Sequence, residues 1–327
     1  MTTALAERQD VRVHSVPPLT PTPHDSWVAR WINAQPALAL ARLAHSGALL
    51  HGMASEASIA WAPHRQVVTI HDTVPWTLGR RNAITSRHLA AQKRRLRRCA
   101  AIIAVSDSVA AEAIERLGLD AGRTHVVPEG VSPVFTATPR EDDYDARRRA
   151  GIIARDYLLW VGSLRRHDPR KALDVLLAAA QQVPSATLVL AGAEGEESRR
   201  LATLGAVLGV RLLLPGYVPD EALAALYRGA AVSVLPSTHE GFGLPVLEAM
   251  ASGVPVVATQ TGNLASLAGD AAVLVPANDP AALAQAINRL LHDPAERARL
   301  AAAGPLTAAR YTWQRAAEMT IAVYRSL

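Results

Sequence analysis

The chain has 327 residues, of which 50% are hydrophobic and 19% are charged; this excludes a disordered protein and favours two packed domains. Its apolar runs fall short of the roughly 20 residues that span a bilayer, its first ten residues lack a secretory pattern, and its single cysteine, Cys99, excludes an internal disulfide framework. We therefore expect a cytoplasmic protein, and its formal net charge of +5 lies wholly within residues 1–149.

The first half contains five short apolar runs that we expect to be strands, at residues 11–16, 48–52, 66–72, 101–106 and 124–130. Between Pro128 and Arg149 the chain becomes rich first in proline and then in charge, which indicates a connection between two domains. The N-terminal domain is accordingly predicted to cover residues 1–140.

One stretch of the first half is strongly basic. No acid occurs between Asp72 and Asp107, while eight cations do: Arg80, Arg81, Arg87, Lys93, Arg94, Arg95, Arg97 and Arg98. Residues 87–100 fit an amphipathic helix, and the cations within 80–98 can rest on an anionic membrane surface, each contributing about 1 kcal/mol. A peripheral position on the inner face of the membrane and an ordinary solvated helix face both stay open. Nucleic acid is not expected, because no aromatic residues interleave with the charges.

The second half, residues 150–327, alternates regularly between apolar strands and helices. We expect its strands at 157–161, 187–192, 210–214, 231–235, 255–259 and 271–275. Strands that are apolar on both faces and alternate with helices indicate a parallel sheet covered on both sides. The predicted fold class is therefore α/β, with two doubly wound Rossmann-like domains facing each other across a cleft and with a last helix that is free to cross back to the N-terminal domain. Ligands bind such sheets at the carboxyl ends of the strands.

The strongest motif is LPSTHEGFGLPVLEAMASG at residues 235–253, where a strand leads through a glycine-rich loop into a helix. Backbone N–H groups of Gly241, Phe242, Gly243 and Leu244 and of the first helical turn can point at an anion or a sugar hydroxyl. Glu240 and Glu248 can hold two parts of a sugar nucleotide, one the hexose hydroxyls and the other the ribose diol. Taken singly, each acid also fits a solvated loop or a favourable helix-dipole position.

This motif resembles the paired-glutamate motif of the retaining glycosyltransferases of family four, at its full spacing and with similar flanking residues. The resemblance implies the GT-B fold, with Glu240 contacting the transferred sugar, Glu248 the nucleotide ribose, and Phe242, Gly243 and Leu244 giving backbone contacts to the donor.

A second motif, WVGSLRRHDPRKALDVLLAA at residues 160–179, ends a strand at Gly162 and places Arg170 and Lys171 at a predicted helix start. Two cations are unfavourable there unless an anion such as a diphosphate lies between them. The family has its donor-phosphate motif here, but this loop has about two extra residues, so that either Arg165 or Arg170 takes the role of the family's arginine. Gly216 and Val218, in PGYVPDEALAALY at 215–227, resemble the family's nucleobase-binding turn; an ordinary strand–helix joint is the alternative.

In the first half, His71 follows a predicted strand, at the place where the family has a histidine near the transferred sugar. VVPEGVSPVF at residues 126–135 matches the family's V-P-N-G-V stretch, with Glu129 in place of asparagine. The family's front-face mechanism needs no enzyme nucleophile. No metal or cofactor is expected: Asp143 and Asp145 form a D-x-D, but in a charged segment rather than after a strand.

The resemblance is incomplete at two places. The opening strand and glycine-rich loop of the family have no counterpart at the start, and Ser266 stands where relatives have an acid. The sequence predicts a metal-independent hexosyltransferase that uses a nucleotide sugar and a saccharide or lipid-linked acceptor. A non-catalytic sugar-nucleotide-binding protein that lacks the glycine loop is the alternative. A Rossmann oxidoreductase is disfavoured, because no G-x-G-x-x-G follows the first strand.

Overall fold

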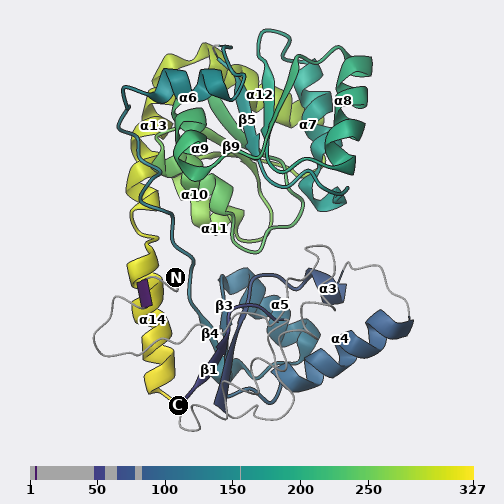
Figure 1. The fold of residues 1–327 in the computed structure, drawn as a ribbon, viewed down its shortest axis with the longest axis vertical. Coiled ribbons are helices and arrows are strands. Elements are labelled where there is room, and N and C mark those ends of the chain that lie inside the picture. The colour runs from purple at the N-terminus through teal and green to yellow at the C-terminus, as the bar shows by residue number, and fades with distance from the viewer. Residues whose placement is uncertain (1–3, 6–47, 56–64, 78–82, 155) are drawn as a thin grey trace. The chain divides into compact units, whose positions relative to one another are not determined.

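The computed structural model describes five parts of the chain, namely residues 4–5, 48–55, 65–77, 83–154 and 156–327. The strand predicted at residues 11–16 and the expected difference at the start of the chain lie outside these residues. The chain divides into two compact units (Figure 1). The first unit combines Met1–Gly130 with Trp313–Leu327, and the second unit is Val131–Thr312.

The first unit contains a parallel sheet whose described strands follow the order β1-β2-β3-β4. These strands are β1 (Leu50–Gly52), β2 (Gln66–Ile70), β3 (Ala101–Ala104) and β4 (Thr124–Val126), which confirms the four predictions from residue 48 onward. In the register, Val67 lies opposite Ala101 and Ile102 opposite Thr124. Every residue of β2 and β3 is buried, as expected for parallel strands covered on both faces.

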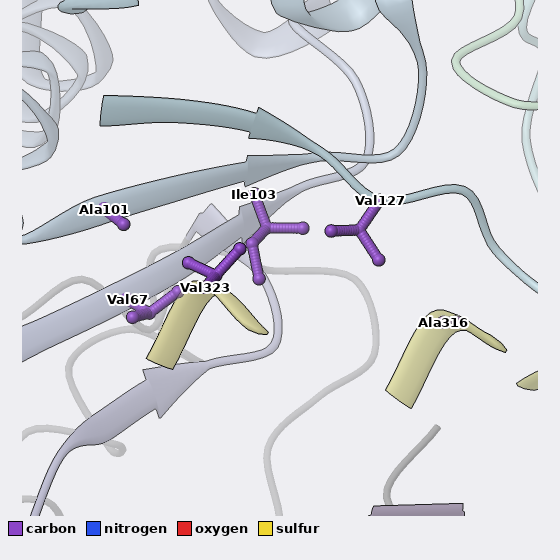
Figure 2. Close-up of a cluster of buried hydrophobic side chains, with 6 residues drawn as sticks. All are labelled: Val67, Ala101, Ile103, Val127, Ala316 and Val323. Atoms are coloured by element: carbon purple, nitrogen blue, oxygen red, sulfur yellow. The ribbon is translucent and has the colours of Figure 1, made fainter. Parts of the chain in front are cut away.

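Four described helices belong to this sheet: α3 (Val74–Thr77), α4 (Ala83–Leu96), α5 (Asp107–Leu117) and α14 (Trp313–Arg325). Helix α5 is well delimited, because the Ser106 side chain accepts a hydrogen bond from the backbone of Val109 and Gly118 ends the helix at a φ of 61°. Helix α14 packs on the sheet through a buried apolar cluster (Figure 2), formed by Val67, Ala101, Ile103, Val127, Ala316 and Val323. The last helix is thus part of the core of the first unit.

The second unit contains a six-stranded parallel sheet in the order β10-β9-β8-β5-β6-β7. Its strands are β5 (Leu158–Val161), β6 (Leu188–Ala191), β7 (Leu212–Gly216), β8 (Val232–Leu235), β9 (Val256–Thr259) and β10 (Val273–Val275). With β5 counted as the first strand, the order is 6-5-4-1-2-3, which is that of dinucleotide-binding sheets. The strand order reverses between β5 and β8, and this pair is the switch point at which such sheets bind ligands.

The helices of the second unit lie in two groups beside this sheet (Figure 1), with α7 against α8 and α12, and α9 against α6 and α10. Their bounds are α6 (Asp143–Arg149), α7 (Leu173–Gln181), α8 (Glu196–Leu208), α9 (Asp220–Gly229), α10 (Leu244–Ala251), α11 (Leu264–Ala268), α12 (Pro280–His292) and α13 (Pro294–Ala308). Both units are therefore α/β with parallel sheets, as predicted.

The stretch predicted as a connection differs from the prediction. The units change at Gly130, and α6 already packs on α9, where Asp143 pairs with Arg228 at 2.5 Å. Because this ion pair is buried, with the Arg228 side chain 4% exposed, Asp143 ties α6 to α9, and this part of the segment belongs to the second unit.

Candidate functional site at a strand switch point

Two motif loops follow the two strands at the switch point. The loop after β5 contains Lys171, and the loop after β8 contains Glu240. A backbone hydrogen bond joins them, since the N–H of Thr238 donates to the carbonyl oxygen of Arg170 at 2.7 Å. The sequence predicted each loop separately, and the sheet topology brings them together.

Close backbone packing fixes the start of the first loop. The N–H of Gly162 donates to Ala191 at 3.0 Å, and a Cβ atom on Gly192 would overlap the carbonyl oxygen of Gly162. A Cβ on Gly162 itself would meet the indole of Trp160 at 2.7 Å. Gly162, a predicted donor-site residue, therefore has a packing role as well, because only glycine lets the backbone segments at Gly162 and Gly192 come this close.

The turn that carries the two cations differs from the expected helix start. Pro169–Lys171 is a short 3₁₀ turn, Ala172 has a φ of 48°, and α7 begins only at Leu173. Asp168 caps this turn and binds the Arg170 guanidinium through two hydrogen bonds, of 2.7 and 2.9 Å. The charge of Arg170 is thus already balanced, which removes the local argument that an anion must lie beside it.

Lys171 lies in a more restricted environment. Its ammonium group donates to the carbonyl oxygen of Ser163 and lies 5.8 Å from the centroid of the Trp160 ring. Burial lowers the pKa of Lys171, and this effect outweighs that of Asp168, while Glu240 also acts on it electrostatically. A partly desolvated ammonium group interacts more strongly with an anion than a fully hydrated one does.

The extra residues of this loop are held by contacts with the first residues of α8. The carbonyl oxygen of Arg165 accepts a hydrogen bond from Glu196 at 2.9 Å, and His167 lies 3.2 Å from the buried carboxylate of Glu197. Glu197 in turn binds Arg200 at two points. The backbone of Arg165 is therefore fixed by this hydrogen bond, and Arg165 is an exposed residue.

Glu240 is held by Ser237, whose hydroxyl donates to its Oε1 atom at 2.7 Å. Burial raises the pKa of Glu240, against the opposing effects of Ser237, Arg170 and Lys171. The backbone of the loop after β8 is fixed by the hydroxyls of Thr259 and Thr261, which both donate to the carbonyl oxygen of Ser237. This carboxylate therefore has a fixed position within the field of two cations.

The start of α10 follows from the same loop. Gly243 has a φ of 105°, and a Cβ there would meet Leu264 at 2.6 Å. The Phe242 side chain is buried and packs edge-on against Tyr311 with a centroid distance of 5.9 Å, while its carbonyl oxygen accepts a hydrogen bond from Asn263. Phe242 thus contributes a core side chain, and Gly243 lets the chain turn into the helix.

Glu248 extends from α10 toward a buried phenol. The Tyr227 hydroxyl on α9 lies 3.0 Å from Oε2 of Glu248 and 3.3 Å from the carbonyl oxygen of Pro245. Burial raises the pKa of Glu248 to about 7, and the hydrogen bond from Tyr227 acts in the opposite direction. Tyr227 could not be predicted from the sequence, because no residue spacing shows that α9 places a phenol beside α10.

The turn predicted to line a nucleobase follows β7. Gly216 closes the strand with a φ of 74°, and its carbonyl oxygen accepts a hydrogen bond from Gly192 at 2.9 Å. Val218 is buried, whereas Tyr217 between them is 73% exposed. The turn therefore presents an aromatic residue that the sequence analysis did not single out.

His71 lies in the first unit, directly after β2. Its Nδ1 atom lies 3.0 Å from Oε1 of Glu129, and its Nε2 atom lies 2.8 Å from the carbonyl oxygen of Met53. The hydrogen bond that His71 donates to Glu129 raises the pKa of His71 more than burial lowers it. Asp72 has a local role, because it caps the turn at Val74. Glu129, which stands in place of the family's asparagine, thus favours the imidazolium form of His71.

The basic stretch forms helix α4, as expected. Two cations of the basic stretch bind the last carbonyl groups of helix α5. Lys93 donates to the carbonyl oxygen of Arg116 at 2.7 Å, and Arg97 donates to that of Leu117 at 2.7 Å. Arg87, Arg94 and Arg98 are exposed, while Arg80 and Arg81 lie outside the described residues. A membrane role for residues 80–98 stays a prediction.

The described residues contain no cluster of three or more His, Cys, Asp or Glu that could hold a metal ion. Nor is any helix in this part of the chain long and apolar enough to cross a membrane.

Comparison with known families agrees with this geometry in both units. Residues 155–293 match the family described as "Glycosyl transferases group 1", and residues 2–135 match "Glycosyltransferase Family 4". The two matches together cover most of the chain, and the match to residues 155–293 contains the switch point. The chain therefore belongs to the family four, group 1, glycosyltransferases.

Similar curated proteins include a D-inositol 3-phosphate glycosyltransferase of Corynebacterium urealyticum, 35% identical over 241 residues, covering 69% of this chain and 56% of the relative. Another is the O-antigen chain mannosyltransferase B of Escherichia coli, 33% identical over 235 residues, covering 69% of this chain and 60% of the relative. The matches thus span somewhat more than half the length of these relatives.

Solved structures confirm the GT-B fold. Sucrose-phosphate synthase from Thermosynechococcus elongatus has a TM-score of 0.79 at 26% identity, covering 98% of this chain and 86% of that one. HepE of Anabaena, solved in complex with UDP and glucose, has a TM-score of 0.76 at 22% identity, covering 89% of this chain and 81% of that one.

Proposed function

We propose that this chain is a retaining glycosyltransferase that moves a hexose from a nucleotide diphosphate sugar to a saccharide or lipid-linked acceptor. The observation that carries the proposal is the joining of the Lys171 turn to the Glu240 loop at the switch point, through the hydrogen bond from Thr238 to Arg170. A cation and a carboxylate held together suit a donor that combines an anionic diphosphate with a sugar rich in hydroxyls.

The similar proteins support this class of substrate. The named relatives are a D-inositol 3-phosphate glycosyltransferase and an O-antigen chain mannosyltransferase, and HepE was solved with UDP and glucose. For a lipid-linked acceptor, the exposed arginines of α4 would favour a position at an anionic membrane surface on the cytoplasmic side.

In this proposal the second unit binds the donor. Lys171 offsets the charge of the diphosphate, and Glu240 accepts hydrogen bonds from the hydroxyls of the sugar. Glu248 accepts hydrogen bonds from the ribose diol, Gly216 and Val218 line the base, and the backbone of Gly241, Phe242, Gly243 and Leu244 approaches the donor. Arg170 reaches the diphosphate only if its pair with Asp168 opens, so the exposed Arg165 is the better second cation.

Transfer would then proceed on one face of the sugar. The bond between the anomeric carbon and the leaving phosphate oxygen breaks, the acceptor oxygen bonds to the same face, and the acceptor proton passes to that phosphate oxygen. The protein needs no nucleophile, because orientation and charge lower the barrier. Lys171 stabilises the leaving diphosphate without a metal ion or cofactor, and Asp143 of the D-x-D is already paired with Arg228. The role near the transferred sugar that the family resemblance implies for His71 stays a prediction.

The test is to substitute Glu240→Gln and compare it with Glu221→Gln, which changes an exposed acid of α9 in the same unit. Donor binding is found first by thermal shift with UDP-, GDP-, ADP- and TDP-sugars, since a bound donor raises the melting temperature. Glu240→Gln should reduce donor-dependent release of the nucleoside diphosphate by about 100-fold or more, while Glu221→Gln retains it. Wild-type turnover in Glu240→Gln would contradict the proposal, and donor binding without turnover in the wild type would favour a non-catalytic binding protein.

A further inference from the structure

A buried phenol lies against the carboxylate that is proposed to hold the ribose. Tyr227 is fully buried on α9, and its hydroxyl lies 3.0 Å from Oε2 of Glu248. The ring is also fixed, because Phe135 packs edge-on against it with a centroid distance of 5.8 Å. The phenol therefore has one orientation, and its oxygen has a defined place beside Glu248.

The hydroxyl has a single hydrogen and two acceptors within reach. It can donate to Glu248 or to the carbonyl oxygen of Pro245, which lies 3.3 Å away. Donation to an ionised carboxylate is the stronger of the two, because charge-assisted hydrogen bonds are shorter and stronger than neutral ones. Burial and the nearby Glu248 carboxylate raise the pKa of Tyr227 well above its usual value, so the phenol keeps its proton and stays a donor.

Helix α9 does not depend on this hydroxyl for its place. The Tyr157 hydroxyl donates to the carbonyl oxygen of Leu226, and Arg228 forms a buried ion pair with Asp143 at 2.5 Å. A phenylalanine at position 227 would keep the packing against Phe135 without burying a polar group. A buried hydroxyl costs free energy unless it is paired, so its presence next to Glu248 calls for a function of that pair.

We propose that Tyr227 is a positioning residue, whose hydroxyl holds Oε2 of Glu248 so that Oε1 faces the ribose diol of the donor. This inference rests on the proposed function, in which Glu248 binds the ribose. Two groups that act on Glu248 in the described structure come from α9: the neutral Tyr227 phenol donates to it, and the charged Asp220 carboxylate opposes its ionisation. Tyr227 favours the ionised form that accepts two hydroxyl hydrogen bonds.

The experiment compares Tyr227→Phe with Tyr157→Phe, which removes the other buried phenol that reaches α9 without touching Glu248. Calorimetry gives the Kd of UDP, GDP and ADP and of their 2′,3′-dideoxy counterparts for the wild type and each variant. Tyr227→Phe should weaken binding of the ribonucleotide by about 10-fold, the loss of one hydrogen bond to a charged group, and should leave dideoxynucleotide binding unchanged. Tyr157→Phe should leave the ratio of the two affinities as in the wild type.

Two further readouts separate positioning from a general loss of structure. Ribonucleotide affinity should rise with pH as Glu248 ionises, and the midpoint of that rise should move to higher pH in Tyr227→Phe only. In a Glu248→Ala background, Tyr227→Phe should have no further effect on affinity. If Tyr227→Phe and Tyr157→Phe weaken both nucleotide types equally, or the effects add in the double variant, the inference is wrong. If the wild type binds no nucleoside diphosphate, the proposed function fails as well.

Discussion

The two units have the same kind of sheet but present their polar residues differently. In the second unit, Lys171 and Glu240 are partly buried and held by backbone and hydroxyl contacts at one switch point. In the first unit, the His71 side chain is 45% exposed, and its ring contacts the Glu129 carboxylate and the carbonyl oxygen of Met53. Burial is the largest effect on the pKa values of Lys171 and Glu240, whereas the direct pair with Glu129 is the largest effect on that of His71. The proposed donor site is thus held by packing, whereas His71 is held by two hydrogen bonds at a more exposed position.

The largest expected effect tests how strictly packing fixes the switch point. Gly192→Ala should destabilise the second unit by about 3 kcal/mol or more, because the new Cβ would overlap the backbone of Gly162. Gly209→Ala is the matched control, since Gly209 also has a positive φ, of 69°, but has nothing within 4 Å of the added Cβ. It should cost only the left-handed strain of about 1–2 kcal/mol. Equal losses in urea unfolding would show that the close approach does not matter.

An intermediate effect is an opposite response of the two units to acid. Burial lowers the pKa of His51 in the first unit to about 4, so the unfolded chain takes up a proton first as the pH falls below 6.5. Its contribution to the free energy of unfolding is complete above pH 6.5 and falls between 6.5 and 4. Glu248 in the second unit has a pKa of about 7, so the folded chain keeps a proton that the unfolded chain loses. Its contribution is complete below pH 4.5 and falls as the pH rises from 4.5 to 7.

Each contribution amounts to at most about 3 kcal/mol, at 1.36 kcal/mol for each unit of pKa shift. Calorimetric unfolding between pH 4.5 and 7 checks it in the wild type, His51→Gln and Glu248→Gln. His51→Gln should remove the contribution to the free energy of unfolding that falls as the pH is lowered. Glu248→Gln should remove the contribution that falls as the pH is raised. The same pH dependence in all three proteins would refute the contrast.

The smallest effect concerns the surface pair. Glu129→Gln should lower the pKa of His71 toward its ordinary value of 6.5, because Glu129 is the main cause of the upward shift. Stability from this pair is complete below pH 6.5 and is lost as the pH rises through the folded pKa. NMR titration of the His71 ring measures the change, with Glu115→Gln on the exposed face of α5 as the control. An unchanged His71 titration in Glu129→Gln would mean that the contact with Glu129 has no electrostatic effect.

The fold was largely accessible from the sequence, because parallel strands that are buried on both faces leave continuous apolar runs. The ten described strands correspond to the ten apolar runs predicted from residue 48 onward. The two motif loops were also predictable, since glycines and charged residues at the ends of strands are local signals. The boundary near Gly130 was not, because a charged segment such as residues 141–149 has the same composition in a linker and in a surface helix.

The parts of the site that the sequence did not reveal depend on contacts between distant residues. Asp168 neutralises Arg170 only because the chain forms a 3₁₀ turn in place of the predicted helix start. Tyr227 reaches Glu248 only because α9 packs beside α10. Ser237 belongs to the quoted motif, yet only the loop geometry shows its hydrogen bond to Glu240.

The central claim is that the switch point of the second unit binds the diphosphate of a sugar nucleotide, and titration calorimetry with UDP, GDP, ADP and TDP tests it most directly. At least one of them should bind the wild type, and Lys171→Ala should weaken it by about 10-fold or more, through the loss of a partly desolvated charge. Arg289→Ala, which removes an exposed cation of α12, should leave the Kd unchanged. If no nucleoside diphosphate binds, or if Lys171→Ala binds as tightly as Arg289→Ala, the switch point is not the donor site.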